Sequence, residues 1–268
     1  MRLERFFQQR PVFTTKEITD FLKSSRGVGP RTRESLLSYH TGTGRLLKVR
    51  RGLYAVVPPG TEPATCNVDP FLLAARMTDD ATLAHHTALE FHGVAYSVHR
   101  TLLYLTKQKA RPTTFRGTGF RPLQHPKALR EAGEEEFGVA LLDRRGMDVR
   151  VTGLERTLVD VLDKPRLSGG WEEIWRSLEA VRFFDVRKVI EYALLLNNAT
   201  LAAKVGFYLD QHRDGRMLTE AHLDPLRARR PRRPHYLDRG KREPGRLIPD
   251  WNLVVPPALL DRTWEETP

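Results

Sequence analysis

The apolar residues of the first sixty positions change their spacing once, and this change constrains the fold more than any other feature of the chain. Between residues 3 and 7, and again between 18 and 22, apolar side chains recur every three or four positions, as on the buried side of a helix. Between residues 46 and 57 they instead flank Arg50-Arg51-Gly52, where glycine permits a tight turn between two strands. The pattern predicts a small helical domain that ends in a β-hairpin.

Prolines, glycines and possible helix-capping residues predict where the elements of this segment begin and end. Pro11 ends the first helix before a short extended piece, and Thr14 or Thr15 can cap the second helix. Pro30 follows the glycine-containing turn 24–30 and suits the first turn of a third helix. In that helix we expect Leu36, Leu37 and either Tyr39 or His40 to pack inward. The whole is a helix-turn-helix followed by a wing.

Positive charge is concentrated in the same segment. Residues 1–57 carry 12 basic and 4 acidic side chains, a net charge of +8 out of +11 for the whole chain. Residues 58–212 carry 20 of each sign, and residues 213–247 carry 11 basic and 5 acidic side chains. This distribution favours a polyanionic partner for the N-terminal segment. The alternative is that the arginines, 34 of the 44 basic residues, reflect coding bias and form solvated faces.

The third helix and the hairpin divide the expected contacts with double-stranded DNA between them. A recognition helix presents its N-terminal residues to base edges, and a neighbouring basic ribbon contacts phosphates. The predicted base-reading residues are Arg31, Thr32, Arg33, Ser35 and Ser38. The predicted backbone contacts are Arg45, Lys48, Arg50 and Arg51. The alternative is an amphipathic helix with ordinary surface charges and a hairpin that only completes the small core.

Four stretches in this order resemble one known family. They are GRLLKVRRGLYAVVP (44–58), LAHHTALEFHG (83–93), VTGLERTLVDVLDKP (151–165) and RLIPDWNLVVP (246–256). The chain is identified on this pattern as a member of the AbiEi-type antitoxins of type IV toxin–antitoxin systems. The resemblance implies a cytoplasmic repressor that binds repeats upstream of its own operon. It also implies a C-terminal domain that counteracts a nucleotidyltransferase-like toxin without a tight complex.

The remaining residues predict a second, larger domain. A proline-containing connector at 59–70 separates the winged helix-turn-helix domain, residues 1–58, from residues 71–268. Helix-like stretches at 70–77 and 83–91 precede strand-like runs at 101–106, 113–116, 137–142 and 149–151, and helices dominate 154–226. The expected fold class is α+β, with an antiparallel sheet and a helical second half in the larger domain.

Enzymatic, metal-dependent and membrane functions lack their sequence signals. The chain has no [DE]xK triplet, no Asp-x-Asp pair, no phosphate-binding loop and no nucleophile elbow, so we expect no enzyme and no cofactor. The spacing of His85, His86 and His92 differs from a helical zinc motif, and core or surface roles are favoured. Cys66 stands alone, and no apolar run approaches membrane-spanning length. These observations favour a cytoplasmic protein.

Two charged groups leave alternatives open. Glu155, Arg156 and Asp160 form either an ion-pair network within one helix, which is favoured, or a contact used in antitoxicity. The basic segment 225–246 is either a solvated, partly disordered loop or a second surface for DNA, RNA or an acidic protein. Its basic residues are Arg227, Arg229, Arg230, Arg232, Arg233, Arg239, Lys241 and Arg242. Two further functions remain open: a winged-helix transcription factor with a ligand-binding or dimerising C-terminal domain, and a C-terminal RNA-binding module.

Overall fold

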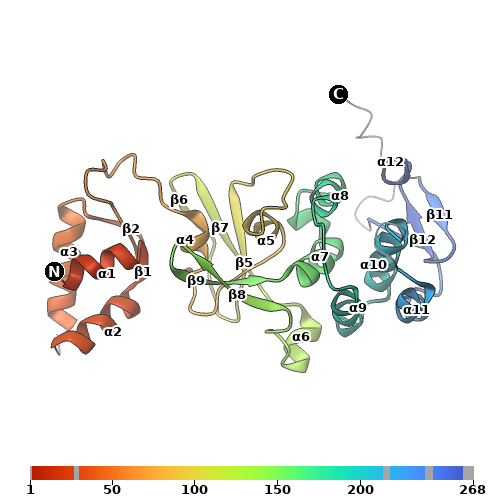
Figure 1. Cartoon of the computed structure of the whole chain (residues 1–268), viewed down its shortest axis with the longest axis horizontal. Helices are drawn as coiled ribbons and strands as arrows, with labels where there is room; N and C mark the ends of the chain where they lie inside the picture. The colour runs from red at the N-terminus through yellow and green to blue at the C-terminus, as the bar shows by residue number, and fades with distance from the viewer. Residues whose placement is uncertain (1, 27–29, 214–217, 239–243, 262–268) are drawn as a thin grey trace. The chain divides into compact units, whose positions relative to one another are not determined.

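The fold is α+β, as predicted, with helices and short sheets alternating along the chain (Figure 1). The computed structural model describes residues 2–26, 30–213, 218–238 and 244–261. Two compact units are present: the first contains residues 1–83, 100–123 and 141–150, and the second contains 84–99, 124–140 and 151–268. The predicted domain boundary at 58–59 stays a prediction, because the first unit includes residues on both sides of it.

The N-terminal part of the first unit has the element order of a winged helix. Its elements are α1 (Arg2–Gln9), β1 (Val12–Thr14), α2 (Thr15–Arg26), α3 (Pro30–Gly42), β2 (Leu46–Arg50) and β3 (Leu53–Val56). The strands form one antiparallel sheet in the order β1-β3-β2, with Val12 opposite Ala55. The helix end at Pro11 and the extended piece after it are therefore confirmed.

Phenylalanine side chains hold this small domain together. Phe13 of β1 lies with its ring centroid 5.2 Å from that of Phe6 and 5.9 Å from that of Phe7, both on α1. Around them lies a buried cluster that also contains Ile18 of α2 and Leu37 of α3. Each aromatic ring in such a cluster buries a large apolar area, so a few rings give these short elements a core.

A helix cap at Thr14 and a glycine at position 52 fix the start of α2 and the turn between β2 and β3. The Thr14 hydroxyl accepts a hydrogen bond from the backbone N–H of Glu17 (3.2 Å), and the Glu17 carboxylate accepts one from the N–H of Thr14 (2.7 Å). This reciprocal capping box decides between the two predicted caps in favour of Thr14. Gly52 adopts φ +83° in the hairpin turn, a conformation that disfavours other residues.

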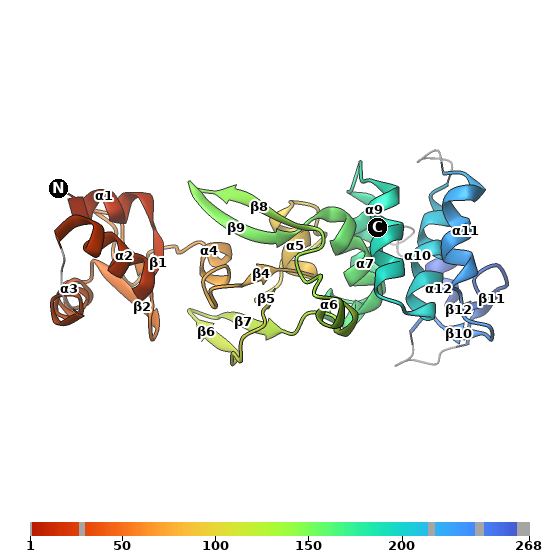
Figure 2. The same ribbon diagram turned by 90° about the horizontal axis from the view of Figure 1, so that it is seen from below.

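The larger sheet of the chain is mixed rather than antiparallel. Its strands are β4 (Thr82–Leu83), β5 (Thr101–Leu105), β6 (Thr113–Phe115), β7 (Thr118–Leu123), β8 (Val139–Arg144) and β9 (Met147–Thr152), in the order β6-β7-β5-β4-β9-β8. β5 and β7 are parallel because residues 106–112 carry the chain to the sheet edge, where β6 and β7 form a hairpin that returns beside β5. Figure 2 shows the β6–β7 and β8–β9 hairpins. α4 (Pro70–Ala74), which Asp69 caps, precedes β4.

Helices form most of the second unit. They are α5 (His86–Phe91), α6 (Lys127–Ala132), α7 (Leu154–Asp163), a 3₁₀ turn (Pro165–Leu167), α8 (Trp171–Glu179), α9 (Val186–Leu195), α10 (Ala199–Gln211), α11 (Glu220–Ala228) and α12 (Pro257–Leu260). β10 (His235–Tyr236), β12 (Leu253–Val255) and β11 (Arg246–Ile248) form a small sheet in that order. None of the helices within the described ranges combines the length and apolar composition needed to cross a bilayer.

The core of the second unit depends on one close approach. Trp251 is fully buried against α10, and a Cβ atom placed on Gly206 would lie 2.1 Å from its ring. Any side chain at position 206 would therefore displace the indole. The indole N–H donates to the Asp210 carboxylate (3.1 Å), so the ring is fixed at both its apolar and its polar end.

Candidate nucleic-acid interface

The predicted recognition helix exposes most of its predicted base-reading residues. Arg31, Thr32, Ser35 and Ser38 of α3 are all exposed. Residues three, four or seven positions apart share a helix face, so these side chains form one polar strip along the N-terminal and middle turns. α3 lies on the outer side of the N-terminal helix group in both views (Figures 1 and 2). This arrangement suits a helix that enters the major groove.

Arg33 differs from its neighbours because it is turned back onto α2. Its Nη1 donates to the Thr19 hydroxyl (3.2 Å), and its Nη2 donates to the Glu34 carboxylate (3.3 Å). Its side chain is 22% exposed, whereas that of Glu34 is 73% exposed. The structure thus gives Arg33 a role in joining α2 and α3, which the residue type and spacing did not indicate.

Of the two alternatives Tyr39 and His40, His40 is the one that packs inward. The His40 ring lies edge-on to Phe7 with centroids 5.3 Å apart, while Tyr39 remains 66% exposed. Burial lowers the pKa of His40, and Arg45 acts in the same direction against the opposing charge of Glu4. A neutral imidazole suits this apolar contact. Sequence reasoning left the two residues as alternatives and so missed the exposed tyrosine.

The hairpin exposes only part of its predicted backbone-contacting set. Lys48, Arg50 and Arg51 are exposed. Arg45 instead donates to the Glu4 carboxylate (2.6 Å) and to the Val57 carbonyl (2.5 Å). Arg50 donates to the Met77 carbonyl. The turn itself is fastened to α2, because the N–H of Thr15 donates to the Gly52 carbonyl (2.8 Å).

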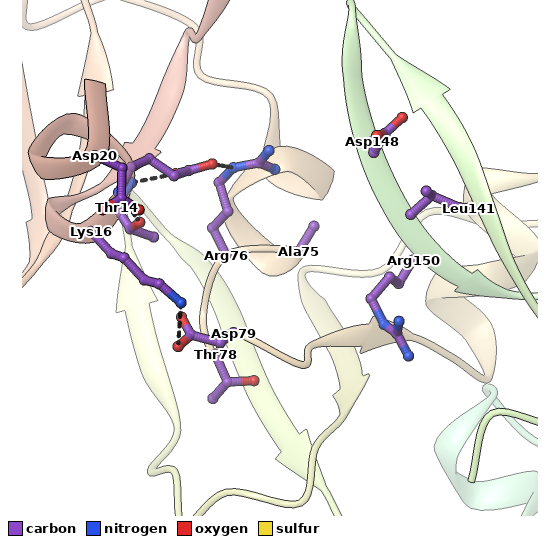
Figure 3. A pocket seen from close by; sticks show the side chains of 11 residues that line it. Thr14, Lys16, Asp20, Ala75, Arg76, Thr78, Asp79, Leu141, Asp148 and Arg150 are labelled. Carbon is purple, nitrogen blue, oxygen red and sulfur yellow. Dashed lines mark hydrogen bonds and ion pairs between the residues drawn. The ribbon is translucent and has the colours of Figure 1, made fainter. Parts of the chain in front are cut away.

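A pocket of mixed charge lies beside α2. Figure 3 shows its lining side chains, with an ion pair between Glu17 and Arg76 (3.4 Å) and another between Lys16 and Asp79 (3.9 Å). Its ionisable residues are Lys16, Arg76, Arg150, Glu17, Asp20, Asp79 and Asp148. Four carboxylates among three basic groups do not suit a polyanion, so this pocket is not part of the candidate interface.

The described part of the second basic segment is folded, and several of its arginines have partners. Arg227 of α11 pairs with Glu220 (3.0 Å) and Asp224 (2.9 Å), and Arg229 donates to the Asn197 side chain (3.2 Å). Arg230 donates to the carbonyl of Arg227, whereas Arg232 and Arg233 are exposed. Tyr236 of β10 is 37% exposed. Arg239, Lys241 and Arg242 lie outside the described residues.

Arg156 and Asp160 of α7 belong to a buried network, whereas Glu155 is half-buried and accepts a hydrogen bond from the N–H of Asp185 (3.0 Å). Arg156 and Asp160 pair at 3.4 Å, with side chains 0% and 3% exposed. Tyr192 donates to Asp160 (2.7 Å), and Arg156 donates to the Phe137 carbonyl (2.6 Å). The favoured interpretation, an ion pair within one helix, is confirmed. The alternative, a contact used in antitoxicity, gains no support from Arg156 and Asp160, because both side chains are buried.

A second buried cluster was not predicted. Carboxylate oxygens of Glu90 and Glu173 lie within hydrogen-bond distance of the two ring nitrogens of His86, at 2.8 and 3.0 Å, and the His99 ring stacks on His86 with centroids 3.4 Å apart. Only the i, i+4 spacing of His86 and Glu90 was visible in the sequence. Both ring nitrogens face carboxylates, so the cluster is a structural clamp between α5 and α8. No three His, Cys, Asp or Glu side chains converge on a metal-sized site within the described ranges.

Comparison with known proteins agrees with the recognition made from sequence. Residues 1–57 match the family model described as a transcriptional regulator, AbiEi antitoxin. The crystal structure of the RV2827C protein from Mycobacterium tuberculosis is similar, with a TM-score of 0.62 and 17% sequence identity over 98% of this chain and 94% of that one. At this identity the likeness shows the fold alone. No curated protein matches the chain. Over residues 1–57 the chain is therefore similar to the AbiEi antitoxin family of transcriptional regulators.

Proposed function

We propose that this protein is a DNA-binding repressor of its own operon. The observation that carries the proposal is the exposed polar strip of α3 (Arg31, Thr32, Ser35, Ser38) on a segment with a net charge of +8. Arginine and hydroxyl side chains at the start of a recognition helix bind base edges, and excess positive charge holds the helix on the duplex. The family description, a transcriptional regulator, supports the same function.

Different residues would provide the specificity and the affinity of DNA binding. Arg31, with Thr32, Ser35 and Ser38, would read bases, while exposed Lys48 and Arg51 would bind phosphates. We assign Arg33 and Arg45 mainly to holding the winged helix together, because their guanidinium groups already bind Thr19 and Glu4 respectively. Arg50 is exposed and also donates to the Met77 carbonyl, so we assign it mainly to joining the hairpin to residues that follow the winged helix. DNA-binding affinity and domain stability then depend on different arginines of the same basic segment.

We also propose that the protein is the antitoxin of a type IV pair and that residues beyond the winged helix counteract a nucleotidyltransferase-like toxin. Support comes from the family description of residues 1–57 as an antitoxin and from the motifs at 83–93 and 151–165. In the structure both motifs contribute buried side chains, including His86 and Arg156. We therefore infer that these motifs maintain the fold of the second unit and that exposed residues elsewhere act on the toxin.

Binding to the DNA upstream of the gene tests the proposed repressor function. Full-length protein is titrated against that DNA and against a shuffled duplex of equal length at several salt concentrations. We expect tighter binding to the upstream DNA, and equal affinity for the two duplexes would refute a sequence-specific repressor. An adjacent gene for a nucleotidyltransferase-like protein would support the antitoxin role.

The two activities can be separated in the full chain. A variant with Arg31→Ala, Lys48→Ala and Arg51→Ala changes only exposed side chains, so it should remain folded and lose operator binding. If the second unit carries antitoxicity, this variant still rescues growth of cells that express the neighbouring gene. Loss of rescue by a folded variant would show that antitoxicity requires DNA binding.

A further inference from the structure

The exposed face of α3 contains an aromatic residue that no sequence argument assigned to DNA. Tyr39 is 66% exposed on the candidate recognition helix. It follows Thr32 by seven residues and Ser35 by four, so the three side chains share one face of the helix. The face that would meet the duplex therefore extends beyond the polar strip and ends in a phenol ring.

The Tyr39 ring is held in place from behind. Its centroid lies 5.2 Å from that of His40 in an edge-to-face arrangement, and His40 packs in turn against the buried Phe7. Edge-to-face aromatic pairs are weakly attractive and restrict the orientation of each ring. The side chain is therefore exposed and oriented at once, which lowers the conformational entropy that a bound tyrosine would lose.

The position of Tyr39 along α3 decides what it can reach. A helix rises 1.5 Å per residue, so Tyr39 lies about 10 Å beyond Thr32 along the axis. The major groove is about 12 Å wide, and its edges are lined by phosphates. If the first turn of α3 contacts bases and the helix axis is tilted out of the groove, Tyr39, about 10 Å further along and pointing about 100° away from Ser38, lies nearer to the groove edge and its phosphates.

We propose that the Tyr39 hydroxyl donates a hydrogen bond to a DNA phosphate and so positions α3 in the groove. This inference rests on the proposed DNA-binding function and adds a contact to it. A phenol donates one hydrogen bond and carries no positive charge. The contact therefore adds affinity for every sequence without releasing a counterion, unlike the contacts of Lys48 and Arg51.

The test compares Tyr39→Phe with the unchanged protein on the upstream duplex and on the shuffled duplex, over a range of salt concentrations. We expect Tyr39→Phe to bind both duplexes about fivefold more weakly, the usual contribution of one neutral hydrogen bond. The slope of log affinity against log salt stays unchanged. Tyr39→Ala, which also removes the ring, should lose at least as much.

Two further variants serve as controls. Tyr96→Phe removes a hydroxyl from another exposed tyrosine, 58% exposed in the second unit, and should leave DNA binding unchanged. Arg51→Ala should weaken binding and also flatten the salt dependence. Equal melting temperatures of Tyr39→Phe and the unchanged protein show that folding is not the cause of any loss.

Three results separate the inference from the function on which it rests. If Tyr39→Phe binds both duplexes as tightly as the unchanged protein, the hydroxyl makes no contact and the inference is overturned. If the loss is confined to the upstream duplex, Tyr39 reads a base and the phosphate assignment is wrong. If the unchanged protein itself fails to prefer the upstream duplex, the proposed repressor function is refuted before Tyr39 is tested.

Discussion

Arg31 and Arg33 lie two residues apart in the same helix, and we predict that their removal has opposite consequences. The changes are Arg31→Ala and Arg33→Ala, made separately in the full chain. Arg33→Ala removes a hydrogen bond to Thr19 and an ion pair with Glu34, whose side chain is 73% exposed. The hydrogen bond contributes about 1 kcal/mol and the exposed ion pair about 0–1 kcal/mol. Arg33→Ala should therefore lower the free energy of unfolding by about 1–2 kcal/mol.

For the preference between DNA sequences we expect Arg31→Ala to have the larger effect and Arg33→Ala the smaller one. Arg31 is exposed at the start of α3, so Arg31→Ala should change the free energy of unfolding by less than about 0.5 kcal/mol. If its guanidinium binds a guanine through two hydrogen bonds, its loss removes about 1–3 kcal/mol of discrimination. The preference for the upstream duplex over the shuffled one then falls by about 5- to 150-fold. Arg33→Ala should retain that preference.

Two measurements decide between these expectations. Urea unfolding monitored by circular dichroism gives the free energy of unfolding, and fluorescence anisotropy with labelled duplexes gives the two affinities. The reasoning is refuted if Arg33→Ala unfolds like the unchanged protein and relaxes the sequence preference as much as Arg31→Ala. In that case the guanidinium of Arg33 leaves Thr19 to read DNA, and its position in the structure does not reveal its function.

Three further predictions concern the second unit. Full burial lowers the pKa of His85 to about 4, so the neutral form is favoured on folding; the associated stability is complete above pH 6.5 and is lost as pH falls towards 4. Between pH 7 and pH 5 the free energy of unfolding should fall by about 2 kcal/mol more in the unchanged protein than in His85→Asn, and an equal fall in both would contradict this reasoning. Gly206→Ala should lower the melting temperature strongly, because its methyl group would overlap Trp251, and an unchanged melting temperature would contradict this packing. Asp160→Asn should lower the free energy of unfolding by about 3–5 kcal/mol in urea, because it leaves the Arg156 charge buried without its ionic partner; a loss below 1 kcal/mol would show that the ion pair is dispensable.

Residues close in the sequence were sufficient to predict the helices and strands at the N-terminus. Pro11 lacks the N–H that would continue the helix before it, and Gly52 permits a turn that other residues resist, so each acts without help from distant residues. The predicted extended piece at 12–14 is β1 in the structure. The mixed direction of the larger sheet was not predictable in this way. Strand direction depends on the path of residues 106–112 to the sheet edge, and the spacing of apolar residues does not predict that path.

In the candidate interface, too, some features follow from nearby residues and others only from the tertiary structure. The sequence by itself determined that a basic helix-turn-helix with a hairpin lies at the N-terminus, because apolar spacing, proline and glycine act over a few residues and charge is additive. Only the tertiary structure decided that Arg33, Arg45 and Arg50 bind partners within the protein, and that Arg31, Lys48, Arg50, Arg51 and Tyr39 are exposed. An arginine has the same donors in either role. Whether those donors meet Thr19, Glu4 or solvent depends on residues up to 41 positions away in the chain, which folding brings alongside.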